Sequence, residues 1–334
     1  MKDPKDPVCS MIPKGRSERE GGRNPQRGVA LILTLLILTL LVAVGLEVTR
    51  NVRIEASLAG NFRDLTQASC IAQSGVEIAR ALIQEDDPSY DGLDEKWAQM
   101  ATFSQGSQGL FPEGHFRGFL VDENSKLNVN ALVDTFGNVV QKKKEQLERL
   151  LSLLGYDAGF LEALLDWLDP DDKRRPLGAE GDEYRAQGLG YRPKNGPMDT
   201  LGEMLLIPGV EPTVFHGTGE REGLKNFLTV HSDGRVNINT ASGPVLMSLS
   251  PKVDLTRAQA VLVARSEKPF RRPEDLRSVA GWDEIFPEIV TEITVRTNYF
   301  SVEMVGNFRE AKAWIQAIIR RDGKRTRILS WRSG

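Results

Sequence analysis

Seven acidic side chains lie close together in one short stretch, and they are the densest group of residues that could do chemistry. They are Asp166, Asp169, Asp171, Asp172, Glu180, Asp182 and Glu183. Carboxylates this close repel one another unless water surrounds them or they share a cation, and hard oxygen ligands suit Ca²⁺. The spacing is not that of an EF-hand, because Lys173 and Arg174 stand where that loop needs an acidic or amide side chain and a glycine. From the residues alone, a metal site and a solvated acidic loop balanced by Lys173, Arg174 and Arg175 remain equally open.

Other residue types that commonly do catalysis are sparse. The three histidines, His115, His216 and His231, lie in separate segments. The two cysteines, Cys9 and Cys70, cannot form a disulfide framework, and soft ligands are too few for a Cys/His zinc site. The sequence has no nucleophile elbow, no zincin helix motif and no P-loop. We therefore predict that the protein is not an enzyme.

A nucleic-acid-binding module is the alternative function. The segments Val236 to Ala241 and Phe270 to Leu276 are similar to the helix-hairpin-helix of DNA-uptake proteins. That module needs a glycine-rich hairpin whose backbone N–H groups meet phosphate, whereas the expected hairpin here, Leu249 to Asp254, has no glycine pair. The formal net charge of −3 for the chain, or −6 without residues 1–28, also opposes phosphate binding.

The elements that carry these residues begin with an apolar block. From Val29 to Leu46, eighteen consecutive residues have no charge. As a helix they would span about 27 Å, close to the thickness of the hydrocarbon core of a bilayer. Residues 1–28 contain seven basic and four acidic side chains, a net charge of +3. By the positive-inside rule, the N-terminus should stay in the cytoplasm and the rest of the chain should be exported.

The flanks of the block favour processing on its N-terminal side. A cleaved secretory signal should be followed by small residues, but here Glu47 to Arg53 follow. Before the block stands Gly28, and the segment looks like a type IV prepilin leader that is cut after Gly28, so that Val29 becomes the first residue. An ordinary signal anchor followed by a separate helix is the alternative. Most pilins carry a glutamate at the fifth mature position, where this chain has Leu33.

Helical patterning continues far beyond the apolar block. Apolar residues recur at spacings of three and four from Val48 to Leu82, with no proline between Val29 and Asp87. We predict one helix of more than fifty residues. Its first half would lie in the membrane, and its second half would present an apolar stripe that includes Phe62 and Leu65.

The remainder combines a sheet with an insertion. A pattern of basic, apolar, Asn, apolar, Asn occurs at residues 126–130 and again at 235–239, each time before helical patterning, which predicts two related helical units. From Tyr299 the apolar period changes to two, and Asp322 with Gly323 indicates a hairpin. The strand-like segment His115 to Asp122 should belong to the same antiparallel sheet, so that the helical units are inserted between its strands.

Capping residues set the expected helix boundaries inside the insertion. Gly155 should close a helix that carries Leu147 to Leu154. We expect Asp199 and Thr256 to cap the helices that follow them.

Together these features resemble the K family of minor pseudopilins in type II (general) secretion. The motifs that carry the resemblance occur in the family's order: Asp166 to Asp172, Gly178 to Glu180, Tyr191 to Asn195, and Val236 to Ala241. The family implies an α+β, pilin-like fold in which a long N-terminal helix packs on an antiparallel sheet, with a large inserted α-helical domain of two sterile-alpha-motif-like units. It also implies cleavage after Gly28 by prepilin peptidase, N-methylation of Val29, and association with the I and J minor pseudopilins.

The resemblance implies a location and a set of site residues as well. The protein would be a single-pass protein of the inner membrane, with its globular domain in the periplasm at the tip of the pseudopilus. There it would support protein export across the outer membrane. The absence of an acid at Leu33 suits a subunit with no subunit above it, and Leu33, Phe62 and Leu65 are the candidate partner contacts. Family members bind calcium in the inserted domain, and the candidate ligands here are Asp169, Asp171, Asp172, Glu180 and Asp182.

The expected domain organisation follows from these elements. It comprises a cleaved leader (1–28), a transmembrane part of the long helix (29–48), the helix and first strand of a pilin-like domain (49–123), a first inserted helical unit (124–227), a second inserted helical unit (228–292) and the C-terminal sheet (293–334).

Overall fold

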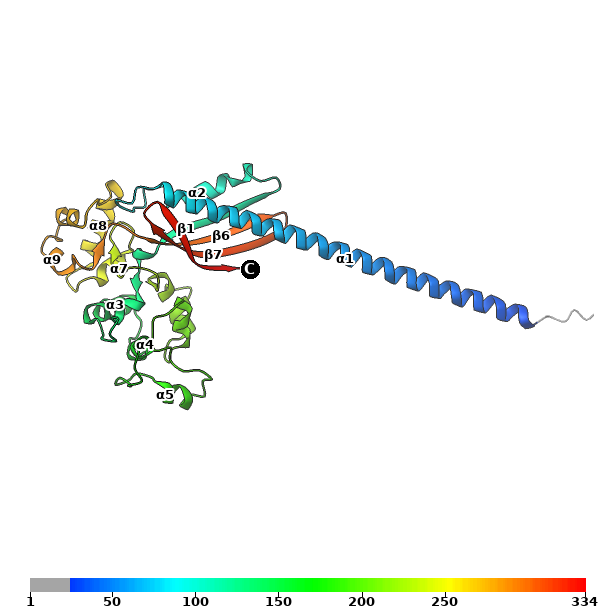
Figure 1. The fold of residues 1–334 in the computed structure, drawn as a ribbon, viewed down its shortest axis with the longest axis horizontal. Helices are drawn as coiled ribbons and strands as arrows, with labels where there is room; N and C mark the ends of the chain where they lie inside the picture. The colour runs from blue at the N-terminus through cyan, green and yellow to red at the C-terminus, as the bar shows by residue number, and fades with distance from the viewer. Residues whose placement is uncertain (1–24) are drawn as a thin grey trace, which may run out of the picture. The chain divides into compact units, whose positions relative to one another are not determined.

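The computed structural model describes residues 25–334, so most of the predicted leader lies outside the described residues (Figure 1). The helices are α1 (Pro25–Glu85), α2 (Met100–Gln105), α3 (Gln141–Leu154), α4 (Leu161–Leu168), α5 (Gly181–Ala186), α6 (Pro212–His216), α7 (Gly243–Ser248), α8 (Leu255–Glu267) and α9 (Phe286–Ile289). The strands are β1 (Gly114–Asp122), β2 (Leu127–Asn128), β3 (Leu228–Thr229), β4 (Val236–Asn237), β5 (Ile293–Thr294), β6 (Tyr299–Phe308), β7 (Ala311–Asp322) and β8 (Arg325–Ser333). Short 3₁₀ turns, among them η4 (Leu201–Leu206), η5 (Leu224–Asn226) and η6 (Pro273–Ser278), connect them.

The prediction of one long N-terminal helix is confirmed. Helix α1 has 61 residues and ends at Glu85, because Pro88 biases the residue before it away from helical backbone angles. The chain divides into two compact units, one that ends at Gly60 and one that comprises Asn61–Gly334. In the first unit, the apolar side chains of α1 are exposed.

The second unit contains a four-stranded antiparallel sheet of strand order β1-β6-β7-β8. The segment at Gly114–Asp122 therefore joins the C-terminal strands, as predicted, although about half of the chain separates it from them. Asp322 pairs with Arg325, which leaves Gly323 and Lys324 as a two-residue hairpin loop, and Gly323 has a φ of +62°.

The end of α1 packs on one face of this sheet (Figure 1). Its buried residues contact the alternate side chains of the strands that point to the same face, including Ile71, Ala72, Val76, Ala79 and Ile83 from α1 and Phe300, Val302, Met304, Ile315 and Ile319 from β6 and β7. At Gly306 the two backbones nearly touch, since a Cβ there would lie 2.0 Å from the carbonyl oxygen of Ala68. The mixed α+β architecture predicted from the sequence is thus confirmed.

The insertion between β1 and β6 contains two small parallel strand pairs. Leu127 pairs with Leu228 in β2 and β3, and Val236 pairs with Ile293 in β4 and β5. Each pair brings the start and the end of one helical segment together. The first strand of each pair lies in the repeated sequence pattern.

The second asparagine of each repeat explains why the pattern occurs twice. The side chain of Asn130 accepts from the N–H of Met198 at 2.8 Å and donates to its carbonyl at 3.0 Å. Asn239 does the same with Phe270, at 2.9 Å in both directions. Each asparagine thereby mimics a strand partner and holds the loop that leads into a 3₁₀ turn, η4 or η6.

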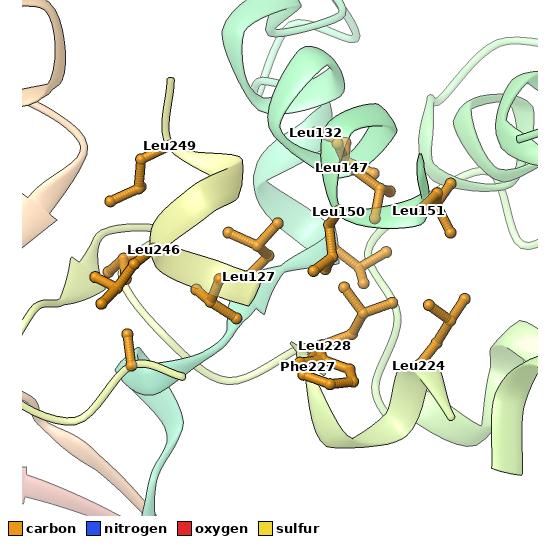
Figure 2. Packing of buried hydrophobic residues seen from close by; sticks show 14 of the residues in the cluster. Leu127, Leu132, Leu147, Leu150, Leu151, Leu224, Phe227, Leu228, Leu246 and Leu249 are labelled. Carbon is orange, nitrogen blue, oxygen red and sulfur yellow. The ribbon is translucent and has the colours of Figure 1, made fainter. Parts of the chain in front are cut away.

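One hydrophobic cluster joins both parts of the insertion. Leucines of α3, of β2 and β3 and of α7 interdigitate with one another (Figure 2), and ten of the residues are labelled there: Leu127, Leu132, Leu147, Leu150, Leu151, Leu224, Phe227, Leu228, Leu246 and Leu249. Gly155 closes α3 with a φ of +72°, as expected.

Both predicted capping residues are wrong by one or two positions. Thr200 precedes η4, while the Asp199 carboxylate lies 2.7 Å from Lys194 Nζ. Asp254 caps α8 by accepting from the N–H of Arg257 at 2.8 Å, so Thr256 lies inside the helix. In each case more than one residue near the helix start could serve as a cap, and packing decides between them.

Candidate functional site

The acidic stretch forms a pocket where α4 ends. The apolar face of α4 is buried, and its last turn takes Asp166 and Asp169 inside with it. Arg175 from the following loop pairs with both carboxylates, and its Nη1 lies 3.0 Å from Asp166 Oδ1. Burial raises the pKa of Asp166 and of Asp169, and the Arg175 guanidinium opposes that rise. One arginine is thus shared by two buried acids, which leaves one negative charge without a counter-charge when both are ionised.

Glu180 closes the pocket from the N-terminal end of α5. Its side chain is 5% exposed, and neither carboxylate oxygen has a hydrogen-bond partner. Burial raises the pKa of Glu180 to about 7, and the nearby negative charges of Asp166 and Asp169 add to the effect. Gly178 is required for this arrangement, because a Cβ there would lie 2.0 Å from Asp166 Oδ2.

The other predicted ligands are exposed. Asp172 and Asp182 line the same cavity as Glu180, whereas Asp171 does not. Asp171 is exposed and accepts from the N–H of Lys173 at 2.8 Å. Asp172 is exposed and accepts from the amide of Asn195 at 2.8 Å. The Asp182 side chain is 86% exposed and forms an ion pair with Arg185 at 3.2 Å.

Asn195 is a pocket residue that the sequence analysis missed as a candidate. Its side-chain oxygen is buried without a hydrogen-bond partner. It ends the Tyr191 to Asn195 motif, which could have drawn attention to it, since asparagine oxygens are common cation ligands.

The pocket combines unpartnered oxygens with a mixed charge. The cavity that contains Glu180 and Asn195 is lined by four acidic and four basic side chains, which are Asp172, Glu180, Asp182, Glu183, Arg174, Arg185, Arg192 and Lys194. Oδ1 of Asp169, both carboxylate oxygens of Glu180 and Oδ1 of Asn195 are buried and unpartnered. Buried polar atoms are ordinarily hydrogen-bonded, and the hydrogen-bond donors Trp167 Nε1 and the Tyr184 hydroxyl are unpartnered here as well, so the unpartnered oxygens could accept from bound water or coordinate a cation. A hard cation such as Ca²⁺ fits this donor set.

A second acidic cluster lies where the insertion returns to the sheet. Among the residues that the structure describes, one group of three acidic side chains has its oxygens within 4.8 Å of one another, and it consists of Asp86, Asp91 and Glu95. Arg321 at the end of β7 supplies the counter-charge: Nη2 donates to both oxygens of Asp91, at 2.8 and 2.6 Å, and Nη1 lies 3.3 Å from Asp86. The N–H of Thr297 also donates to Asp91 at 2.7 Å.

Glu95 is the member of this cluster without a cation against it. Its Oε2 accepts from the N–H of Gly92 at 2.9 Å and from Trp97 Nε1 at 3.0 Å. Burial raises the pKa of Glu95 to about 8, and the charges of Asp86 and Asp91 contribute to the rise. Nothing in the local sequence signals this cluster, because Arg321 comes from a strand more than two hundred residues away.

The predicted processing and partner residues all lie on α1. Gly28 and Val29 are exposed near its start. Leu33, Phe62 and Leu65 are exposed as well, with Phe62 at 74%. The apolar segment is long and hydrophobic enough to cross a membrane.

The expected nucleic-acid hairpin lies between α7 and α8. Lys252 within it forms an ion pair with Glu288, and Ser250 is buried. Arg265 of α8 also makes contacts within the protein, since it donates hydrogen bonds to the carbonyls of Ile238 and Ala241 at 3.0 and 2.7 Å. These cations serve internal contacts, and the geometry gives no support to the nucleic-acid alternative.

Comparisons with known proteins agree on one family. Family models described as type II secretion system protein K match residues 125–217 and 236–296. The type II secretion system protein K of Klebsiella pneumoniae is 30% identical over 260 residues, which cover 72% of this chain and 76% of that protein. The Aeromonas hydrophila protein of the same description is 24% identical over 339 residues, 92% of this chain and 96% of that one. In the crystal structure of the GspK-GspI-GspJ complex from the enterotoxigenic Escherichia coli type 2 secretion system, one chain has the same fold, with a TM-score of 0.68 and 22% identity over 83% of this chain and 99% of that chain.

Proposed function

We propose, from the premise that the chain belongs to the type II secretion system protein K family, that it works as a membrane-anchored minor pseudopilin at the tip of the periplasmic pseudopilus. The observation that carries the proposal is helix α1. One continuous helix of 61 residues has an exposed apolar first part and a second part that packs on an antiparallel sheet. A helix of this kind can anchor the subunit and pack against the helices of neighbouring subunits, while the sheet and insertion remain outside the bilayer.

Maturation would occur at the start of this helix. Prepilin peptidase would cut after Gly28 on the cytoplasmic face of the inner membrane and methylate the new N-terminus at Val29. Gly28 has open space around its Cα, so Gly28→Val should leave the fold intact. We expect this variant to remain at precursor mass when it is co-expressed with the peptidase, whereas the parent chain loses 28 residues. Equal cleavage of both chains would contradict the assigned site.

The partners would be the I and J minor pseudopilins of the same system. The related Escherichia coli chain was crystallised with GspI and GspJ, which supports this assignment. Phe62 and Leu65 are exposed apolar residues just before the buried part of α1. We expect Phe62→Glu with Leu65→Glu to abolish co-purification with I and J, while Glu77→Lys on the exposed side of the same helix retains it. An unchanged yield of I and J with the double variant would refute the helix as the contact.

The position at the tip follows from two features. The insertion is large and need not be repeated along a fibre, and Leu33 offers no carboxylate to the terminal amine of another subunit. Such a subunit supports protein export as a cap, without catalysis of its own. A complex of I and J with further pseudopilins that assembles and supports export without this subunit would argue against the tip position.

The acidic pocket would bind calcium. Asp169, Glu180 and Asn195 would supply the buried oxygens, and Asp172 could add one from the rim. Asp171 and Asp182, which the sequence also nominated, are exposed and would contribute through long-range charge. A cation here would relieve the repulsion among the carboxylates and hold the loop between α4 and α5 in place.

Chelation tests the calcium proposal. We expect the melting temperature of the purified protein to fall when the chelator EGTA is added and to recover with excess calcium. Glu180→Gln, which removes one charge but keeps the shape, should reduce this difference, whereas Asp182→Asn should not. A melting temperature that does not change with chelator would reject the site.

A further inference from the structure

The C-terminal hairpin is strongly basic although the chain as a whole carries a formal charge of −3. Residues 309–334 contain eight basic and two acidic side chains, a net charge of +6. The basic residues are Arg309, Lys312, Arg320, Arg321, Lys324, Arg325, Arg327 and Arg332. Arg321 is buried in the acidic cluster described above, and the others are exposed.

Three of these arginines lie on the face of β8 that points away from α1. The hydroxyl of Thr326 accepts from Arg80 and Gln84 of α1, at 3.2 and 2.8 Å, so the side chains in phase with Thr326 face the helix. Arg325 and Arg327 alternate with it and therefore face outward. Beyond an irregularity near Ile318, Arg332 pairs in register with Gln316, which lies between two buried residues of β7 and also faces outward.

The fold does not neutralise this outward face. Arg327 lies directly opposite Arg320 on β7, and like charges in that position destabilise a sheet. Arg320 has Asp322 at 3.1 Å, but Arg325, Arg327 and Arg332 have no acidic partner within 4.0 Å among the residues that the structure describes. Charged side chains on an edge strand also hinder edge-to-edge pairing with further copies, and this row leaves several cations available to an anionic partner.

A cleft extends this row toward the insertion. It has a volume of about 230 Å³ and lies between the outer face of the sheet and the first inserted unit. Arg332 lines it from β8, and Lys225 lines it from η5. Two acids line it as well: Glu123, which is paired with Lys126, and Glu303 of β6. Lys225 is exposed and also has no acidic partner in the described part of the chain. Because Lys126 neutralises Glu123, Arg332 and Lys225 exceed the remaining acid, Glu303, by one charge, and the cleft would attract an anionic group.

The open edge of β8 identifies the kind of ligand. As the last strand of its sheet, β8 has one side whose backbone groups pair with no strand among residues 25–334. Extended polypeptides add to such edges by backbone hydrogen bonds. We infer that the basic strip, defined as Arg325, Arg327, Arg332 and Lys225, forms together with the edge of β8 a docking surface for an extended acidic segment of a partner protein. Nucleic acids and anionic lipids offer the charge but not a backbone whose N–H and C=O groups alternate at the spacing of a β-strand.

Fluorescence anisotropy with a defined peptide tests this surface. The probe is a labelled peptide of about ten residues that alternates glutamate with threonine, which is long enough to pair along β8, and the protein is the full chain in detergent. We expect saturable binding that weakens about tenfold or more in the variant Arg327→Gln with Arg332→Gln, since two charge-assisted contacts are lost. The matched control, Lys96→Gln with Lys268→Gln, removes the same charge from other exposed sites and should bind like the parent.

Four results would overturn the inference. These are full binding by the strip variant, equal weakening in the control, equal binding of a peptide whose backbone N–H groups are methylated, and equally tight, strip-dependent binding of an oligonucleotide of the same charge. The melting temperatures of both variants show whether a loss of binding comes from unfolding. Arg327→Gln removes a like-charge pair, so the strip variant should melt no lower than the parent.

Discussion

Glu95 offers the sharpest test of the buried acidic cluster, because a substitution by glutamine should stabilise the protein. The residue is 9% exposed and its carboxyl lies beside Asp86 and Asp91, and Arg321 contacts those two instead. Burial raises the pKa of Glu95 from its ordinary 4.5 to about 8. At neutral pH the folded chain therefore holds this proton, and the unfolded chain does not.

The sign of the pH dependence follows directly. Between about pH 4.5 and pH 8 the folded state binds one proton more than the unfolded state at this group, so its contribution lowers the free energy of unfolding as the pH rises. At 1.36 kcal/mol per pH unit the complete rise would amount to about 5 kcal/mol. Remaining solvent contact and the two hydrogen bonds to Oε2 reduce this, and we expect about 1–2 kcal/mol. Glu95→Gln keeps the shape and both hydrogen bonds, and its amide can replace the proton shared with Asp86.

Urea unfolding of the full chain in detergent at pH 5, 6.5 and 8 provides the assay. The variant should match the parent near pH 5 and exceed it by about 1–2 kcal/mol at pH 8. Glu274→Gln, an exposed glutamate without an ion pair, is the control and should stay within about 0.5 kcal/mol at every pH. A loss of stability at pH 8 would refute the reasoning, since it would mean that Glu95 is held ionised in the fold.

Three further substitutions probe other contacts. Arg321→Met should cost about 3–5 kcal/mol of unfolding free energy, because it leaves Asp91 buried without a counter-charge; a loss below 1 kcal/mol in urea unfolding would argue against that pairing. Gly306→Val should lower the free energy of unfolding by about 2–4 kcal/mol, because the added side chain forces β6 away from Ala68. Gly60→Ala, in an exposed part of α1, is the control and should not destabilise the chain. Equal melting temperatures for the two variants would exclude a close approach of the two backbones. Asn239→Ala should cost about 1–3 kcal/mol and speed hydrogen exchange at the amide of Phe270, and unchanged exchange there would refute the proposed mimicry of a strand partner.

Much of the architecture could be read from local patterns. The apolar block, the long helix and the period-two strands each depend on residues close in sequence, and the structure confirms all three. Helix caps were less predictable, because Asp199 and Thr256 each have a neighbouring residue that can also cap the helix, namely Thr200 and Asp254. Local chemistry limits the candidates for a cap, and packing selects among them.

In the acidic pocket, the sequence predicted the region but not which of its acidic residues are buried. The density of carboxylates between Asp166 and Glu183 marked the region, but it could not separate buried from exposed acids. The fold buries Asp169 and Glu180, leaves Asp171 and Asp182 in solvent, and adds Asn195 from a later loop. Burial depends on which face of α4 meets the core, and that is a property of the whole inserted domain.

The sequence by itself determined the length and apolar character of the first part of α1, the insertion between strands and the repeated asparagines, because each depends on composition or spacing along the chain. The tertiary structure alone decided which charges meet. It brought Arg321 to Asp91, left Glu95 without a cation, and placed Arg327 opposite Arg320 on an open strand edge. The physical reason is that the energy of a charge depends on its distance from other charges and on the water around it, and both are fixed only when distant segments pack together.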